Sequence, residues 1–375
     1  MTGLTVVKIG GSLLMNGKSY LSVAEEIRKG FGAGNTKVII VVSAMSGVTD
    51  DLLKSFSGSK SALERVIERY VEAAACLGGS RLEARVISEL LKLKLALEVG
   101  SGYDCVLKDL VLSFGEKLSK ILLVEALQQA GVTAAGLNAT EVIKTDGTHG
   151  NALIKYRETR VRLINYVEPV FMEGAVPVIE GFIGSTLDGE VTTLGRGGSD
   201  YTATAIAALL GASEVHIITD VPGIMSADPK YVRSAHIIPE MSYSEAIEAS
   251  IYGCKRLHPR TFHPLTVVHE CRVYVGSWRR STLISRFSSS GCRGPKLVTF
   301  KLKGRHAYVA LVGDGVSEHG IVGKVVDLLR YAGLKYEGIY AFAGRPSIVL
   351  LFKDQVLGKA LNVLHELVVE GVSGA

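Results

Sequence analysis

A lysine and a glycine pair stand together near the start of the chain, in the block Lys8-Ile-Gly-Gly-Ser12. Glycines let backbone N–H groups approach phosphate oxygens, and a lysine beside them supplies a compact positive charge. Gly-Gly pairs are also common turns, so this block by itself indicates either a phosphate-binding loop or an ordinary turn. The stretch from Gly11 to Ser19 resembles a Walker A loop, but we reject it because five residues separate its glycines where the motif has four.

A second block, Leu194-Gly-Arg-Gly-Gly-Ser-Asp200, leads into an apolar helix predicted over 201–210. The guanidinium of Arg196 is a planar fork suited to a carboxylate, and Asp200 offers the opposite charge to an ammonium. Ser199 or Asp200 could cap the helix, whose first N–H groups favour anions. A cation, an anion and a helix N-terminus within five residues predict a site for a zwitterion such as an amino acid. The structural alternative is a glycine turn with an N-cap.

Two further loops carry polar groups after predicted strands. Ser43 and Thr49 supply hydroxyls without a general base, and the chain has no Gly-x-Ser-x-Gly nucleophile elbow. This loop suits the rim of a carboxylate site, or it is an ordinary loop. Asp220 could hold Mg²⁺ or a nucleotide hydroxyl, or it could cap the following turn. The histidines and the cysteine within 258–271 lack the spacing of zinc ligands, so this group predicts no metal site.

The elements that must position these loops alternate between strand and helix. Nearly all-apolar runs predict strands at 5–9, 37–42, 176–181 and 215–219, a pattern typical of a parallel sheet covered by helices. Such sheets bind ligands at the carboxyl ends of their strands, which is where the polar loops fall. Helices are predicted at 21–28, 117–130 and 201–210, with a helical hairpin formed by 63–74 and 82–91 and turning at Gly78-Gly79.

The end of the chain has a pattern of its own. The Ser- and Gly-rich stretch 286–296 predicts a linker between a domain at 1–285 and a second one at 297–375. The second part predicts a small α+β unit, with elements in the order strand 297–302, strand 308–313, helix 320–331, strand 335–342, strand 347–352 and helix 355–369.

Length and composition limit the protein class. A chain of 375 residues with 47% apolar residues is long enough for two packed domains. Its net charge of +5 is too mild to indicate a nucleic-acid partner, and the nine bases of the acid-free stretch 271–313 are expected to form a solvated connector. Five scattered cysteines favour reduced thiols. With no signal peptide or membrane span predicted, we expect a cytoplasmic protein.

Taken together, these blocks resemble the aspartokinase branch of the amino-acid kinase family, and the last 80 residues or so resemble an ACT regulatory module. The Leu-Gly-Arg-Gly-Gly-Ser-Asp block is the most specific, and Lys-x-Gly-Gly is shared with sister kinases. The other blocks that carry the resemblance are Val42-Ser-Ala-Met-Ser-Gly-Val-Thr-Asp50, Phe114-Gly-Glu116, Thr219-Asp-Val-Pro-Gly-Ile224 with Asp228-Pro229, and Lys255-Arg-Leu-His-Pro259.

The resemblance implies an α/β fold, with an open, mainly parallel sheet sandwiched by helices and a ferredoxin-like ACT domain. It implies phosphorylation of the side-chain carboxylate of L-aspartate by MgATP to give 4-phospho-L-aspartate. This is the first step of the pathway to lysine, threonine and methionine. A carboxylate nucleophile, with an ordinary pKa of roughly 4, is already ionised at neutral pH and needs no general base. ACT pairing implies a homodimer or a higher homo-oligomer.

Roles for individual residues follow from the same resemblance. Arg196 would bind the α-carboxylate, while Glu116 and Asp200 would face the ammonium. The implied catalytic residues are Lys8, Lys255 and Asp220. The implied aspartate pocket comprises Ser43, Thr49, Glu116, Arg196, Ser199 and Asp200. The implied nucleotide site comprises Lys8, Gly10, Gly11, Ser12, Thr219, Asp220, Met225, Asp228, Lys230 and Lys255.

The chain departs from the aspartokinase pattern in places. Ile9 and Ser12 stand where these kinases usually have Phe and Thr, and Met225 and Lys230 where they often have Tyr and Arg. The element order of the last part is that of the family's second ACT module. Our hypothesis is that the first module is absent, which argues against feedback inhibition by lysine or threonine; an amino-acid effector at the remaining module is left open.

Two alternatives remain at this stage. One is another kinase of the family, of the acetylglutamate or UMP type. The other is a catalytically dead regulator that senses amino acids through its ACT module. Thr49, Arg196 and Asp200 favour a free α-amino acid, because an N-acetylated substrate or UMP offers Asp200 no ammonium. The charges of the phosphate side, Lys8, Asp220 and Lys255, argue against a dead kinase.

Overall fold

The computed structural model describes residues 3–31, 37–99, 104–254, 257–288 and 293–373. The chain divides into two compact units. The first comprises Met1–Asp220 with Val267–Cys271, and the second comprises Val221–Thr266 with Arg272–Ala375.

The linker predicted at 286–296 does not mark this division, and part of it, 289–292, lies outside the described residues. The predicted boundary between two domains therefore stays a prediction.

The first unit contains the predicted parallel sheet. Its strands lie in the order β3-β4-β2-β1-β7, and each neighbouring pair is parallel. The central strands are β-branched and almost completely buried, as expected of strands covered on both faces. The strands are β1 (Leu4–Ile9), β2 (Lys37–Val42), β3 (Ala134–Leu137), β4 (Val176–Glu180) and β7 (Glu214–Ile218).

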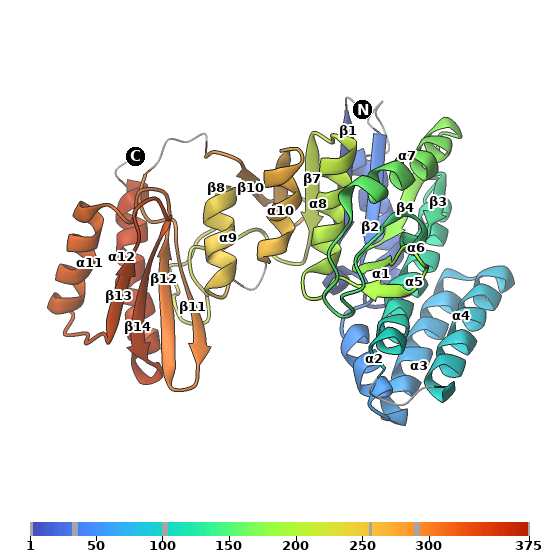
Figure 1. The fold of residues 1–375 in the computed structure, drawn as a ribbon, viewed down its shortest axis with the longest axis horizontal. Coiled ribbons are helices and arrows are strands. Elements are labelled where there is room, and N and C mark those ends of the chain that lie inside the picture. The colour runs from blue at the N-terminus through green and yellow to red at the C-terminus, as the bar shows by residue number, and fades with distance from the viewer. Residues whose placement is uncertain (1–2, 32–36, 100–103, 255–256, 289–292, 374–375) are drawn as a thin grey trace. The chain divides into compact units, whose positions relative to one another are not determined.

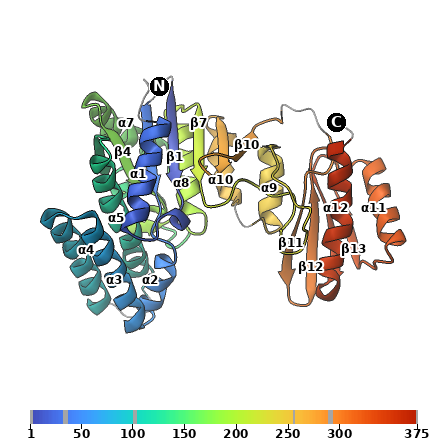
Figure 2. The ribbon, with the colours of Figure 1, turned by 180° about the vertical axis from the view of Figure 1, so that it is seen from behind.

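Helices cover both faces of this sheet. The helices α7 and α8 lie on one face, with α1 and α5 on the other (Figures 1 and 2). This confirms the expected sheet sandwiched by helices. The four helices are α1 (Gly17–Phe31), α5 (Cys105–Gln129), α7 (Tyr156–Met172) and α8 (Gly198–Leu210).

Helix α5 is much longer than the sequence predicted. The prediction began at Lys117, whereas the helix begins at Cys105, after the N-cap Asp104. The carboxylate of Asp104 accepts hydrogen bonds from the N–H groups of Val106 and Leu107 at 2.9 and 3.2 Å. Because most of the helix is buried all round, its sequence lacks the periodic polar face that marks a surface helix. Glu116 consequently lies in the middle of a buried helix.

Further helices adjoin this α/β core. The predicted helical hairpin is confirmed as α3 (Lys60–Leu77) and α4 (Ser80–Val99), and it turns at Gly78 and Gly79 with φ of 77° and 98°. A side chain would be strained at both positions, which explains the glycines. The smaller elements of the unit are η1 (Gly11–Leu13), α2 (Val48–Phe56), α6 (Ala139–Val142), β5 (Ile183–Ser185) and β6 (Val191–Thr193).

The second unit contains the predicted α+β module. Its antiparallel sheet has the order β11-β12-β14-β13, and α11 and α12 pack with it around one apolar core. The predicted element order is confirmed. The elements are β11 (Leu297–Lys303), β12 (His306–Val312), α11 (His319–Tyr331), β13 (Gly338–Ala341), β14 (Ser347–Lys353), η2 (Asp354–Val356) and α12 (Leu357–Ser373).

The acid-free basic stretch is mostly strand, so its interpretation as a solvated connector was wrong. It contains β9 (Arg272–Gly276) and β10 (Ser281–Ser285) in addition to β11 and β12. The bases of these strands are exposed at strand ends whose other residues are partly buried, as with Arg272 in β9 and with Lys301 and Lys303 in β11. Strand β10 pairs antiparallel with β9 and parallel with β8 (Glu240–Ser242). The helices α9 (Tyr243–Ile251) and α10 (Pro259–Val267) complete the elements.

Within the described parts of the chain, none of the helices has both the length and the apolar character needed to cross a bilayer.

Candidate active site

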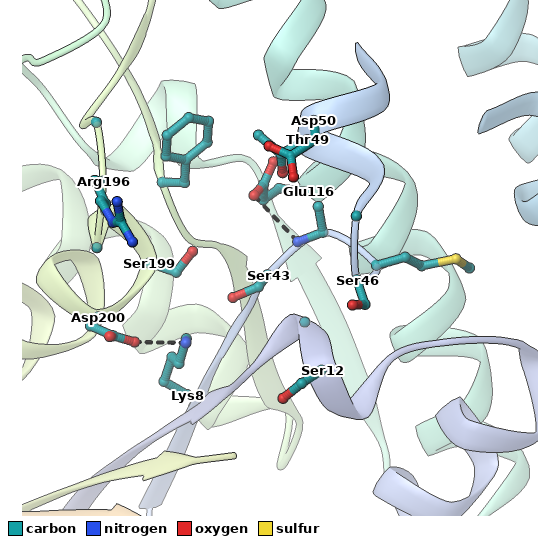
Figure 3. Close-up of a pocket in the computed structure, with 18 residues that line it drawn as sticks. Lys8, Ser12, Ser43, Ser46, Thr49, Asp50, Glu116, Arg196, Ser199 and Asp200 are labelled. Atoms are coloured by element: carbon teal, nitrogen blue, oxygen red, sulfur yellow. Dashed lines mark hydrogen bonds and ion pairs between the residues drawn. The ribbon is translucent and has the colours of Figure 1, made fainter. Parts of the chain in front are cut away.

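A cavity of about 390 Å³ opens in the first unit, at the carboxyl ends of β1 and β2 and beside the starts of α2 and α8 (Figure 3). Its walls bring together all the residues expected to bind aspartate and several of those expected to bind phosphate. The lining residues are Lys8, Gly11, Ser12, Ser43, Ala44, Met45, Ser46, Gly47, Thr49, Asp50, Glu116, Phe182, Gly195, Arg196, Gly197, Gly198, Ser199 and Asp200.

The glycine pair after β1 lets two backbone segments approach closely. A Cβ on Gly11 would lie 2.5 Å from the carbonyl oxygen of Ala44, and one on Gly10 would lie 2.9 Å from that of Ile218. The N–H of Gly10 donates to that same Ile218 oxygen at 2.9 Å. Gly11 lines the cavity and Gly10 is not among its lining residues. The pair therefore fixes the end of β1 against its neighbours, which positions Lys8.

Lys8 and Asp200 form an ion pair in this cavity. The Nζ atom of Lys8 lies 2.6 Å from Oδ1 of Asp200, and the two side chains are 12% and 16% exposed (Figure 3). The sequence assigned these two charges to different parts of the substrates, the phosphate and the ammonium. In the structure they instead neutralise each other, and a partly buried pair of this kind is screened little by solvent.

Glu116 presents a buried carboxylate to the same cavity. Its side chain is 3% exposed, and its Oε1 accepts a hydrogen bond from the N–H of Ala44 at 3.3 Å. Its Oε2 has no hydrogen-bond partner in the described parts of the chain. Burial raises the pKa of Glu116 to about 8, and the negative charge of Glu180 adds to that rise. An unsatisfied buried oxygen at a cavity wall is suited to a cationic ligand group.

Gly115 explains how Glu116 reaches this wall. A Cβ at Gly115 would lie 2.8 Å from the Cβ of Ala44, so only glycine lets α5 approach the loop after β2 so closely. That loop is also held from outside, because Arg69 donates to the carbonyl oxygen of Ser46 at 2.7 Å.

Arg196 lies on the opposite side of the cavity from Glu116. Figure 3 shows Arg196 and Ser199 on the α8 side, with Thr49 and Glu116 on the side of α2 and α5. The Arg196 side chain is exposed, and its guanidinium has no ion-pair partner among the described residues. A cationic fork and an acidic group therefore face each other across one small space.

Two helices point their N-termini at the cavity. Gly47 precedes α2 with φ of 79° and Gly197 precedes α8 with φ of 72°, and neither helix start is capped by a side chain. The predicted capping of α8 by Ser199 or Asp200 was therefore wrong. A left-handed glycine takes the cap position, which leaves both side chains in the first turn and available to the cavity. The uncapped N–H groups favour anions there.

Phe182 is a lining residue that the sequence did not indicate. Its φ of 69° lies in the left-handed region, which costs a non-glycine residue on the order of 1–3 kcal/mol. Its N–H donates to Oγ1 of Thr202 at 3.1 Å, and its carbonyl accepts from the N–H of Leu194 at 2.8 Å. These bonds hold the strained residue beside the loop that carries Arg196. The residue types around Phe182 do not indicate a left-handed backbone at this position.

A buried aspartate, Asp109 of α5, anchors the strand that leads to Arg196. Its carboxylate accepts from the N–H and the hydroxyl of Thr193 at 2.8 and 2.6 Å, and from the N–H of Gly150 at 2.9 Å. The ring of His149 lies 3.1 Å away. Asp109 was also missed by the sequence analysis, because the predicted helix began at Lys117 and did not include this residue.

The residues expected to serve the nucleotide are only partly placed. Oδ1 of the exposed Asp220 accepts from the hydroxyls of Ser12 and Thr219, each at 2.9 Å, so Asp220 joins the end of β7 to the glycine loop. Lys255 lies outside the described residues. The remaining expected residues belong to the second unit, and their roles stay predictions: Met225, Asp228 and Lys230.

Asp228 has a local role in that unit. Its Oδ1 accepts a hydrogen bond from the N–H of Lys230 at 3.0 Å, which closes an Asx turn. Across the described residues, no group of three or more His, Cys, Asp or Glu side chains is arranged to hold a metal ion.

Curated proteins named as aspartokinases are similar to this chain. The "Aspartokinase" of Geobacillus stearothermophilus is 34% identical over 260 residues, covering 69% of this chain and 52% of that protein. The "Lysine-sensitive aspartokinase 3" of Escherichia coli K12 is 32% identical over 285 residues, covering 74% and 62%. The chain thus spans about half to three fifths of the length of these curated relatives.

Solved structures share the fold. The crystal structure of E. coli aspartokinase III in complex with aspartate and ADP matches with a TM-score of 0.87 at 22% identity, covering 98% of this chain and 100% of that one. The aspartate kinase of Clostridium acetobutylicum matches with a TM-score of 0.73 at 21% identity, covering 98% and 99%. The sheet flanked by helices and the antiparallel ACT-like module agree with these neighbours.

A sequence model of one family decides the assignment. The model described as the amino acid kinase family matches residues 3–277, which include every residue that lines the cavity. Because this match covers most of the chain, and the parallel sheet and glycine loops fit it, the chain belongs to the amino acid kinase family.

Proposed function

We propose that this protein transfers the γ-phosphoryl group of ATP to the side-chain carboxylate of L-aspartate, giving 4-phospho-L-aspartate and ADP. The observation that carries the proposal is the single cavity in which Arg196, Glu116 and the Lys8–Asp200 pair meet. The names of the relatives, aspartokinases of several bacteria, support the same activity.

The charges of the cavity suit a free α-amino acid. The fork of Arg196 binds the α-carboxylate with two parallel hydrogen bonds, helped by the uncapped start of α8. The ammonium faces Glu116, whose Oε2 it would satisfy. The hydroxyls of Ser43 and Thr49 supply hydrogen bonds at the rim. The side-chain carboxylate of aspartate is then left to face Lys8.

The reaction requires positioning and charge compensation more than proton transfer. One oxygen of the substrate carboxylate attacks the γ-phosphorus, and the bond from that phosphorus to the β–γ bridging oxygen breaks, so ADP leaves with the electron pair. Lys8 offsets the negative charge on the moving phosphoryl group. To do so it must leave Asp200, which then becomes available to the substrate ammonium. A second contact with the phosphate is proposed for Lys255, because its block resembles the corresponding block of aspartokinases.

Mg²⁺ is the expected companion of ATP, and Asp220 is the residue that fits it. Mg²⁺ is usually held by one or two carboxylates together with substrate phosphates and water. Asp220 is an exposed carboxylate at a strand end, next to the hydroxyl of Ser12 and the glycine loop. When bound with ATP, the ion would neutralise phosphate charge. This chain's part is to present that carboxylate beside the glycine loop.

The alternative activities fit the cavity less well. An N-acetylated amino acid or UMP carries no ammonium, so it would leave Oε2 of Glu116 buried without a partner. A dead regulator would have no use for a partly buried Lys8.

The test is to trap acyl phosphate with hydroxylamine in the presence of MgATP and each candidate acceptor. We expect hydroxamate with L-aspartate, little with glutamate and none with N-acetylglutamate, and no ATP turnover with UMP. Preferred phosphorylation of N-acetylglutamate or UMP would overturn the proposal, as would no turnover with any acceptor by folded protein. Lys8→Ala, which should lower kcat by on the order of 10²–10³, serves as the matched low-activity control.

We also propose a cytoplasmic homodimer or higher homo-oligomer that pairs through the ACT-like module. Support comes from the exposed aromatic residues of that module, Tyr340 and Phe342 at 48% and 61% exposure. Light scattering on the purified protein tests it, since a monomer at micromolar concentration would contradict it.

An amino-acid effector at this module is tested by titrating activity with lysine and threonine. Strong inhibition by either would refute the expectation of weak feedback.

A further inference from the structure

A second cavity, of about 830 Å³, lies in the first unit between α4 and α5 and near the ends of β3 and β4. Both helices can be followed in Figures 1 and 2. No step of the proposed kinase reaction uses this space, and it shares none of its described lining residues with the active-site cavity. The link between them is electrostatic, because the charge of Glu180 contributes to the raised pKa of Glu116. Its volume is in the range of small-molecule sites.

The cavity is strongly basic. Two acids and five bases line it, and each acid is already paired: Glu89 with Lys92 at 2.6 Å and Glu180 with Lys120 at 2.6 Å. Within the described residues, the other three bases have no carboxylate at ion-pair distance. These three are Arg81, Arg85 and Lys117. The walls therefore carry three positive charges that the protein does not neutralise.

The two arginines form a clamp on one helix. Arg81 and Arg85 are four residues apart on α4, so their side chains lie on the same face, and Ser88 and Lys92 continue that face along the cavity. A neighbouring face of α4 is apolar and buried, through Leu82, Val86, Leu90 and Leu93. Guanidinium groups bind phosphate and carboxylate in the same bidentate geometry.

Lys117 forms the inner end of the cavity. It projects from α5, and its Nζ lies 4.9 Å from the centroid of the Phe114 ring. Burial lowers the pKa of Lys117, and the nearby charges of Glu180 and Glu89, neither at ion-pair distance from it, only partly offset this effect. A bound anion would supply that missing partner.

The inner wall is well ordered by its own contacts. Lys120 is held by Glu180 and by Asn138, whose Oδ1 accepts from it at 2.6 Å. Gly136 makes room for that lysine, because a Cβ there would lie 3.3 Å from its Cδ. Lys120 is therefore part of the framework, and the unpaired bases face the open space.

From this arrangement we propose that the cleft between α4 and α5 is a binding site for a small polyanion carrying two or more phosphate or carboxylate groups. The paired forks of Arg81 and Arg85 hold one acidic group, and Lys117 holds another further in. The site is separate from the active-site cavity, so the proposal stands or fails independently of the kinase activity.

The experiment is isothermal titration of the full chain with pyrophosphate and with citrate, in the absence of ATP. We expect saturable binding of at least one probe that weakens as salt is raised. Tighter binding of pyrophosphate would identify a phosphorylated ligand, and tighter binding of citrate a polycarboxylate. Absence of saturable binding for both would overturn the proposal.

Variants locate the probe. Arg85→Gln and Lys117→Met should each weaken binding at least tenfold, as for loss of a charge-assisted contact. The matched control is Lys94→Gln, an exposed lysine of the same helix that does not line the cleft, and it should leave binding unchanged. Because Arg85 is exposed, its substitution should not impair folding even if that of Lys117 does.

A further variant separates the two cavities. Lys8→Gln should leave probe binding unchanged, because Lys8, the residue assigned to phosphate, lines only the active-site cavity. Binding that is lost in Lys8→Gln and kept in Arg85→Gln would place the probe in the active site and overturn the proposal. Equal weakening by Lys94→Gln would show unspecific attraction and overturn it as well.

Discussion

The ammonium of Lys8 and the carboxylate of Asp200 lie 2.6 Å apart, in the wall of the cavity that we assign to the substrates. Lys8 is the last residue but one of β1, and Asp200 lies in the first turn of α8. In the absence of ligands the two side chains neutralise each other's charge. Binding of ATP and aspartate would exchange this pair for two new ones, the phosphate with Lys8 and the substrate ammonium with Asp200.

Replacing Lys8 with Ala should therefore slow catalysis. We expect kcat to fall by on the order of 10²–10³, as for loss of one preorganised charge partner of the transition state. Steady-state kinetics with MgATP and aspartate measures this. The control is Lys18→Ala, an exposed lysine of α1 that should leave kcat unchanged. A rate for Lys8→Ala equal to that of the unmodified protein would remove Lys8 from the mechanism.

Replacing Arg196 with Ala should act mainly on aspartate. The loss of a bidentate contact to the α-carboxylate should raise KM for aspartate about 10- to 100-fold. ATP binding should be nearly unchanged, because the phosphate-side residues are intact. Aspartate and ATP saturation curves on the same preparation distinguish the two. Equal losses for both ligands would indicate a folding defect and contradict the assigned role.

Glu116 should make aspartate binding depend on pH. Since burial raises its pKa to about 8, most of the free enzyme holds this group protonated at pH 6. An ammonium pairs with the ionised form, so binding near neutral pH must release a proton. The KM for aspartate should then fall as pH rises from about 6 to 8, by at most about tenfold per pH unit.

The matched variants for that pH profile are Glu116→Gln and Glu125→Gln, both on α5. Glu116→Gln should give a higher KM that no longer changes with pH, because the amide cannot ionise. Glu125→Gln does not touch the cavity and should keep the original slope. A slope that survives in Glu116→Gln would assign the titration to another group.

Asp109 should affect aspartate affinity without touching the substrate. Its carboxylate holds Thr193 and Gly150, and so fixes the start of the loop that carries Arg196. Asp109→Asn replaces one acceptor oxygen with an NH2 group that cannot accept, which should cost about 1–3 kcal/mol of folding free energy. We expect a lower Tm and a raised KM for aspartate with little change in KM for ATP. An unchanged KM for aspartate would limit Asp109 to a purely structural role.

Much of the site could be predicted because its residues lie in short, recognisable blocks at strand ends. The strands β1, β2 and β7 are nearly all apolar, so the sheet and its ligand-binding edge follow from the pattern. Arg196 and Glu116 are far apart in the sequence, yet the resemblance to aspartokinases placed both in one pocket, where both line the cavity.

What could not be predicted depends on long-range packing. The pairing of Lys8 with Asp200, the left-handed Phe182 and the bonds of Asp109 arise only where separate segments meet. Likewise, the N-cap position of α8 is held by Gly197, whose left-handed backbone a residue with a side chain could adopt only with strain. None of these features leaves a local pattern of residue types.

The most direct test of the account is a crystal structure of the protein with L-aspartate and a non-hydrolysable ATP analogue. We predict the α-carboxylate on Arg196, the ammonium against Glu116 and Asp200, and Lys8 moved from Asp200 to the phosphates. Aspartate bound outside this cavity, or Lys8 still paired with Asp200 while both ligands are present, would contradict the account.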